Sequence, residues 1–174
     1  MKQSSIKVAG LALACGSLLM FSQQSGALEE KIDVSASITN NCVATSQDST
    51  GLAYDPVDVN ATDPLQDANA SLTVTCTMGA AVAIGLDGQN DAENQGSGSG
   101  LHAAKNGSHY LEYATYQDSG YTTLWGHNSQ TSDRLTTTGT GATDQHIIYI
   151  KAPGGQTTLP AGTYSDQLTA TITF

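Results

Sequence analysis

The segment Lys31-Ile32-Asp33-Val34-Ser35-Ala36-Ser37-Ile38 alternates strictly between apolar and polar residues. Successive side chains of a β-strand point to opposite faces, so this alternation predicts a strand with one face for a core and one for water. A second segment of this kind, Leu168-Thr169-Ala170-Thr171-Ile172-Thr173-Phe174, lies at the other end of the chain. The first predicted strand has no hairpin partner beside it. We therefore expect that the strand of one molecule completes the sheet of its neighbour, as in a polymer subunit.

The first residues have the pattern of a secretory signal peptide. Lys2 and Lys7 are followed by an apolar run from Val8 to Phe21 and by the small residues Ser25-Gly26-Ala27. This order of basic, apolar and small residues predicts a signal peptide over residues 1–27. The apolar run is shorter than the roughly 20 residues that span a bilayer. We expect an exported protein whose mature part has no membrane span.

The chain is acidic, with 16 Asp and Glu residues against 6 Lys and Arg residues and a formal net charge of −10. Proteins that bind phosphate backbones or anionic lipids carry a basic surface instead. Nucleic acids and membrane surfaces are therefore poor candidate partners. The charge itself identifies no ligand.

Two cysteines, Cys42 and Cys76, remain after the predicted cleavage. In an oxidising compartment their pairing is the default expectation. Both cysteines lie in phase with apolar neighbours, which favours a buried, structural bridge. Closing a loop of roughly 34 residues would stabilise the fold by about 3 to 4 kcal/mol.

Short alternating or apolar runs recur along the mature chain, separated by clusters of Gly, Asn, Asp, Ser and Pro. Many short strands at this spacing predict a single all-β domain, an antiparallel sandwich. Two longer polar stretches, Asp87 to Gly100 and Asn128 to Asp144, are predicted loops. The predicted strands are Ile32 to Ile38, Leu52 to Val59, Ser71 to Thr77, Ala81 to Leu86, His109 to Tyr116, Tyr121 to Gly126, Gln145 to Ala152 and Tyr164 to Phe174.

The sequence offers little sign of chemistry. Asp87, Asp91 and Glu93 could supply oxygens to calcium, but they lack the alternating spacing of a calcium loop. No G-x-S-x-G motif is present, and catalysis is not expected. The histidines lack the short spacings of zinc ligands, so we predict no metal and no cofactor. We expect their side chains in solvated loops and at sheet rims. The histidines of the predicted mature chain are His102, His109, His127 and His146.

Two stretches carry a resemblance to a known family. Residues 111–118, with Leu111, Tyr113, Tyr116 and Asp118, are followed by Trp125-Gly126, and this resembles the L-x-Y-x-x-Y-x-D … W-G signature of the spore coat protein U domain. That domain also occurs in the pilins of archaic chaperone-usher pili of the Csu type. Residues 162–174, with Gly162, Tyr164 and Asp166, look like the closing strand of the same family. Cys42 and Cys76 fall where its disulfide falls.

The resemblance implies an incomplete immunoglobulin-like sandwich that lacks its final strand. A periplasmic chaperone would lend a strand first, and at an outer-membrane usher the N-terminal extension of the next pilin subunit would replace it. On this interpretation residues 28–40 form the donor extension and residues 41–174 the pilin domain. The donor side chains are Ile32, Val34, Ala36 and Ile38, and the strand that edges the acceptor groove carries Leu168, Ala170, Ile172 and Phe174.

The resemblance thus implies a surface pilus subunit, exported through the periplasm, which supports adhesion and biofilm formation. Two other interpretations stay open. The segment Ile32 to Ile38 could pair within its own domain, which would make the protein a secreted monomeric coat sandwich. Alternatively, loops such as Asp87 to Gly100 could bind a carbohydrate or a surface. Clustered aromatic side chains would favour the latter, but most of the tyrosines lie in predicted strands and are expected to be sheet and core residues.

Overall fold

The computed structural model describes residues 29–91 and 100–174. The predicted signal peptide and residues 92–99 of the predicted loop lie outside these residues. The elements in chain order are β1 (Cys42–Gln47), the 3-10 helix η1 (Val59–Ala61), β2 (Leu65–Cys76), β3 (Ala81–Gly88), β4 (Leu101–Asn106), β5 (His109–Tyr116), β6 (Leu135–Thr138), β7 (Thr143–Ala152) and β8 (Leu168–Thr173).

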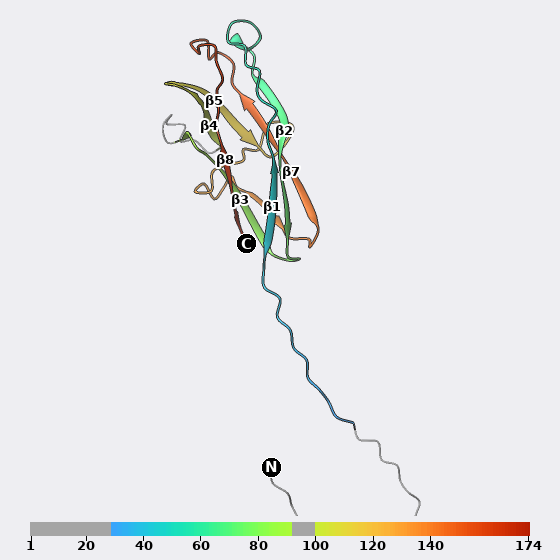
Figure 1. Cartoon of the computed structure of the whole chain (residues 1–174). Coiled ribbons are helices and arrows are strands. Elements are labelled where there is room, and N and C mark those ends of the chain that lie inside the picture. Colours follow the sequence, from blue (N-terminus) through green and yellow to red (C-terminus); the bar gives the residue numbers. More distant parts are fainter. Residues whose placement is uncertain (1–28, 92–99) are drawn as a thin grey trace, which may run out of the picture. The chain divides into compact units, whose positions relative to one another are not determined.

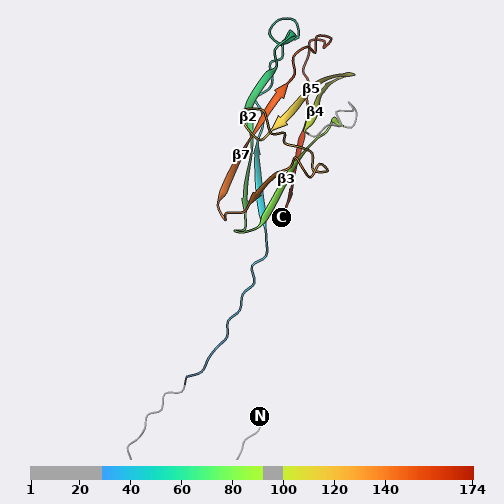
Figure 2. The same ribbon diagram turned by 180° about the vertical axis from the view of Figure 1, so that it is seen from behind.

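The strands form two antiparallel sheets (Figures 1 and 2). One sheet has five strands in the order β1-β2-β7-β5-β4, and the other has three in the order β6-β3-β8. The pairing of β2 with β7 shifts register between Asp67 and Ala70. Strands β1 and β8 are both terminal strands, so each pairs with a neighbour along one edge only.

The core fills the space between the sheets because one face of each inner strand is apolar. Leu72 and Val74 of β2, Ile84 and Leu86 of β3, and Ile150 of β7 are at most 5% exposed. Burying a large aliphatic side chain contributes about 1.5 to 3 kcal/mol. This alternating inward face is the main source of the sandwich's stability.

Trp125 links the two sheets. Its indole Nε1 donates a hydrogen bond of 2.9 Å to the carbonyl of Ile84 in β3, and its backbone N–H donates to Thr115 of β5 at 2.8 Å. The ring is 1% exposed. The signature residue Trp125 therefore joins the two layers.

Asp118 holds the turn that leads to Trp125. Its carboxylate accepts backbone N–H bonds from Thr123 at 2.6 Å and from Gly120 at 2.9 Å. The bond from Thr123 above all, together with bonds from Thr122, holds the pKa of Asp118 below its usual value. The segment Tyr121 to Gly126 is thus a hydrogen-bonded loop, with only the single bridge of Leu124 to Tyr116, and the strand predicted there is wrong.

Other predictions need correction too. The predicted strand Leu52 to Val59 is a turn that ends in η1, with Leu52 and Tyr54 packed against the core from a loop. The predicted loop Asn128 to Asp144 contains β6. The last strand was predicted to start at Tyr164, but β8 starts at Leu168. Strands β1 and β4 were not predicted.

One histidine departs from the expected solvated positions as well. His102 lies on β4 and is 1% exposed. Its ring stacks on that of His127 at 5.0 Å between centroids. His109 is exposed, as expected.

Cys42 and Cys76 form a disulfide, as predicted. The two residues are also register partners, at the first position of β1 and the last of β2. The bridge therefore ties the beginning of an edge strand to its only neighbour in the sheet. Among the helices that the structure describes, none could cross a membrane.

The double variant Cys42→Ala, Cys76→Ala is expected to lower the free energy of unfolding by about 3 to 4 kcal/mol. The bridge joins residues 34 positions apart, and without it this loop is unconstrained in the unfolded chain. Urea unfolding measures the loss, and hydrogen exchange should show that β1 amides lose more protection than those of β7. A loss below about 1 kcal/mol would contradict a structural role for the bridge.

Candidate functional site

An open groove of about 1210 Å³ runs along the core of the domain. Its apolar lining comes from six strands that also build the core, β2, β3, β4, β5, β7 and β8, and from loop residues. Protein interiors are normally packed with few voids larger than a water molecule. A space of this size beside the core therefore lacks a packing partner. The apolar lining residues include Leu52, Tyr54, Ala70, Leu72, Leu86, Ala104, Leu111, Tyr113, Ile148, Ile150, Leu159, Leu168 and Ala170.

Two of the terminal strands, one from each sheet, border this groove. Ser46 and Gln47 of β1 line it from one sheet, and Leu168 and Ala170 of β8 line it from the other. Within the described part of the chain, no further strand pairs with β1 or β8. Unpaired backbone N–H and C=O groups at such an edge readily accept another strand.

The predicted groove residues divide into two groups. Leu168 and Ala170 line the groove, and Ile172 is half-buried against the core. Phe174 follows the end of β8 and is 49% exposed. The groove also uses residues that the sequence did not single out, namely Ser46 and Gln47 of β1 and the loop residues Leu52 and Tyr54. Only the apolar character of Leu52 and Tyr54 could have indicated them.

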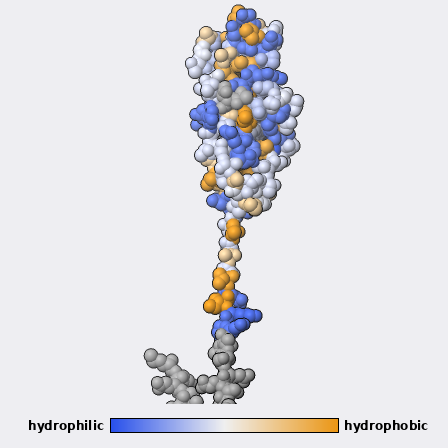
Figure 3. Space-filling view, turned by 90° about the vertical axis from the view of Figure 1, so that its right-hand side faces the viewer, coloured by the Kyte–Doolittle hydropathy of each residue, from blue (hydrophilic) through white to orange (hydrophobic). Residues whose placement is uncertain are grey.

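The predicted donor residues lie outside the two sheets. Residues 29–41 carry no strand, and Ile32, Val34 and Ile38 are 86%, 90% and 87% exposed. Figure 3 shows hydrophobic residues along this segment, and the face of the domain that it displays mixes hydrophilic, intermediate and hydrophobic residues. If the segment paired with another strand, these regularly spaced aliphatic residues would form one apolar face.

Signature residues form a hydrogen-bonded group that lines part of the groove. The Tyr113 hydroxyl donates to Asp166 Oδ2 at 2.7 Å, and the Asn90 amide donates to Asp166 Oδ1 at 3.0 Å. Burial, together with this carboxylate, raises the pKa of Tyr113 well above its usual value. The phenol therefore remains a donor at any physiological pH and ties β5 to the segment that leads into β8.

Two other signature residues shape the same approach to β8. The Tyr164 hydroxyl donates to the Pro160 carbonyl at 2.9 Å, which closes a tight turn. A side chain at Gly162 would collide with Asn106 of β4. The backbone of Lys105 and Ser165 is paired by two hydrogen bonds, so this segment also covers part of the β4 edge.

The groove is suited to a β-strand. Its volume exceeds the roughly 300 to 1,000 Å³ of pockets for small molecules. It combines unpaired edges with apolar floor positions, and strand addition uses both, through main-chain hydrogen bonds and alternate side chains in pockets. The arrangement defines a class of protein, an all-β sandwich with an open site for an added strand.

The family model of the Spore Coat Protein U domain matches residues 29–171. Protein U of Myxococcus xanthus is 34% identical over 125 residues, which are 70% of this chain and 68% of that protein. The chain belongs to the Spore Coat Protein U domain family.

One solved structure supports the fold. A chain in the crystal structure of the CsuC–CsuE chaperone–tip adhesion subunit pre-assembly complex, from archaic chaperone-usher Csu pili of Acinetobacter baumannii, matches with a TM-score of 0.51 at 20% identity. The match covers 79% of this chain and 40% of that one. The E. coli Hda pilus minor tip subunit HdaB matches with a TM-score of 0.39 at 14% identity, over 76% of this chain and 79% of that subunit. The predicted fold class, an incomplete immunoglobulin-like antiparallel sandwich, is confirmed.

The change Tyr113→Phe is expected to lower the free energy of unfolding by about 1.5 to 3 kcal/mol, because it removes a hydrogen bond to a carboxylate while keeping the ring. Tyr149→Phe is the matched control, since Tyr149 makes an edge contact with Tyr121 that a phenyl ring retains. Chemical denaturation of both variants measures the difference. Equal losses in the two variants would contradict the role given to the Tyr113 hydroxyl.

Proposed function

We propose that this protein is a structural subunit of a surface pilus, assembled by the chaperone-usher pathway through donor-strand exchange. The observation that carries the proposal is the open groove between the unpaired edges of β1 and β8. The same chain also has an exposed segment with the alternation of a strand. On this proposal one molecule has both an apolar acceptor groove and a donor segment whose alternate side chains are apolar.

The donor segment is residues 28–40, with Ile32, Val34, Ala36 and Ile38 as the side chains that enter the groove. The three large aliphatic residues would contribute roughly 5 to 9 kcal/mol gross on burial, with a smaller contribution from Ala36. Main-chain hydrogen bonds along β8 add to this value. Ordering the extension costs part of the gain.

A groove of this kind also requires a temporary occupant. Before a neighbouring subunit arrives, the apolar floor and the free edges would promote aggregation. The similar structure from Acinetobacter baumannii is a chaperone–subunit pre-assembly complex, which supports a chaperone as the first partner. An outer-membrane usher and neighbouring pilins would follow, with adhesion and biofilm formation as the roles of the finished fibre. The subunit performs no catalysis on this proposal.

A self-complemented chain tests the proposal. A copy of residues 31–40 is fused after Phe174 through a flexible linker, which supplies the donor strand in the same molecule. Because gross burial of 5 to 9 kcal/mol is available, the midpoint of thermal unfolding should rise by roughly 10 °C or more over the unfused mature chain. The fused chain should also be monomeric.

Two variants of the appended copy serve as controls. Val34→Asp in the copy puts a charge on the face that enters the groove and should remove the stabilisation. Ser35→Asp puts the same charge on the opposite face and should retain it. If the unfused mature chain is already a well-folded monomer that the fusion does not stabilise, the protein is a monomeric sandwich and the proposal is wrong.

A further inference from the structure

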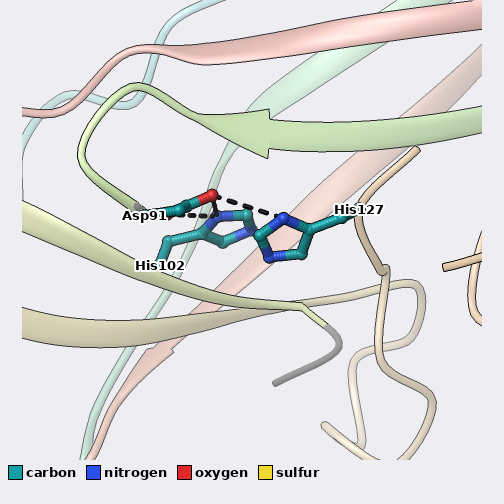
Figure 4. A group of neighbouring side chains, drawn as sticks. All are labelled: Asp91, His102 and His127. Carbon is teal, nitrogen blue, oxygen red and sulfur yellow. Dashed lines mark hydrogen bonds and ion pairs between the residues drawn. The ribbon is translucent and has the colours of Figure 1, made fainter. Parts of the chain in front are cut away.

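Three side chains from separate segments meet beside the β3–β4 end of the sandwich. Figure 4 shows Asp91, which follows β3, with His102 on β4 and His127 in the loop after Trp125-Gly126. Asp91 Oδ2 lies 3.1 Å from His102 Nδ1 and 3.5 Å from His127 Nδ1. The His102 side chain is 0% exposed, and those of Asp91 and His127 are 12% and 14% exposed.

The hydrogen bonds around His102 fix its tautomer. Its Nε2 lies 3.1 Å from the Thr115 hydroxyl, whose oxygen lies 2.8 Å from the carbonyl of Trp125. A carbonyl only accepts, so the single hydroxyl proton is directed to Trp125. His102 Nε2 must then donate its N–H to Thr115. In the neutral ring, Nδ1 therefore presents a lone pair to the Asp91 carboxylate.

The same reasoning applies to His127. Its Nε2 lies 3.1 Å from the carbonyl of Leu101, which can only accept. His127 Nε2 is therefore also the protonated nitrogen. Its Nδ1 faces Asp91 Oδ2 at 3.5 Å and Asp87 Oδ1 at 3.6 Å. The Nδ1 atoms of two imidazole rings and a carboxylate oxygen thus lie within 4.8 Å of one another.

A nitrogen lone pair that faces a carboxylate oxygen repels it unless a proton or a metal ion lies between the two atoms. Two extra protons would remove this repulsion, but they would place two imidazolium rings 5.0 Å apart in a stacked arrangement with one of them fully buried. Like charges at such a distance in a poorly hydrated site repel strongly. One divalent cation at the meeting point satisfies all three groups and leaves both rings neutral.

We propose that Asp91, His102 and His127 bind a divalent transition-metal ion of the Zn²⁺ type, through the carboxylate and the Nδ1 atoms of both rings. The potential ligand atoms lie within 4.8 Å of one another. Zinc bonds of about 2.0 to 2.2 Å to nitrogen and oxygen, in a tetrahedral site, separate the ligand atoms by slightly more than 3 Å. Imidazole and carboxylate ligands suit this metal.

The surroundings also match those of metal ligands. A histidine that binds a metal usually donates its other N–H to a carbonyl or another acceptor, which holds the ring in place. His102 does so to Thr115 and His127 does so to Leu101. Asp87 Oδ1, which also accepts the Asn128 N–H at 3.1 Å, or a water molecule would complete four-fold coordination. The bound ion would tie the end of β3, strand β4 and the His127 loop together.

This inference revises the expectation that the histidines bind no metal. The ligands are 11 and 25 residues apart along the chain, so no short motif connects them. It does not depend on the proposed pilus function, because all three ligands belong to one chain. The measurement can be made on the monomer, the chaperone-bound chain or the fibre.

The test uses the full mature chain, stripped of metal with a chelator and titrated with Zn²⁺ alone by calorimetry. We expect one equivalent to bind, and at 100 times the dissociation constant the unfolding midpoint should rise by about 5 to 10 °C. Cobalt bound in place of zinc should show the visible absorption of a tetrahedral site. Long-range ¹⁵N NMR should place the metal on Nδ1 and the proton on Nε2 of both rings.

His127→Gln should abolish the binding and the thermal shift, and His109→Gln, which changes an exposed histidine on β5, should retain both. Thr115→Val, which removes the acceptor for His102, should weaken zinc affinity by about 10- to 100-fold. The near-ultraviolet circular dichroism of each variant checks that it is folded. The proposal is overturned if folded wild-type chain binds no Zn²⁺ at millimolar concentration, if His127→Gln binds equally well, or if NMR finds both rings doubly protonated in the presence of zinc.

Discussion

The open groove between β1 of one sheet and β8 of the other is the constraint on which the rest of the structure depends. Each strand is paired along one side only, and core residues of both sheets line the groove between them. An added strand forms main-chain hydrogen bonds with the edge and packs its alternate side chains against the apolar residues of the groove. The disulfide at the start of β1 and the Tyr113–Asp166 bond near the start of β8 hold the two sides of that site in place.

The family signature acts through packing and hydrogen bonds. Trp125 joins the sheets through Ile84 and Thr115, and Asp118 holds the turn before it. Tyr113 and Asp166 connect β5 with the segment before β8. These residues therefore hold together the elements that surround the groove. The Asp91–His102–His127 cluster lies next to this frame, since the His102 ring contacts Tyr113 at 5.3 Å.

The inner strands could be predicted from the sequence, because both sheets bury one of their faces and their apolar residues alternate. The predicted runs at Ser71 to Thr77, Ala81 to Leu86, His109 to Tyr116 and Gln145 to Ala152 all lie within or overlap strands. Strand β1 was missed because five of its six residues are exposed, and β6 is a short Thr-rich edge strand. Leu52 and Tyr54 misled the prediction because they pack on the core from a loop.

The groove and the histidine cluster were predictable only in part, because local periodicity does not show which elements meet in space. The alternation of the last strand indicated Leu168 and Ala170, whereas the β1 side of the groove is polar and carries no pattern. The histidine cluster depends on contacts between β4 and a distant loop, and such contacts leave no spacing in the sequence. Local periodicity thus identified strands, but it could not identify which edges stay open or which side chains converge.

Cross-linking between copies tests the central claim most directly. Ser35→Cys on the outward face of the extension would be combined in turn with Thr169→Cys, Thr171→Cys or Thr173→Cys on β8, which together cover the possible registers. After export with the chaperone and usher and mild oxidation, the account predicts a ladder of covalent dimers, trimers and longer species for at least one pair. Cross-linked monomers alone, or no cross-link in any of the three pairs, would contradict the exchange of a strand between chains.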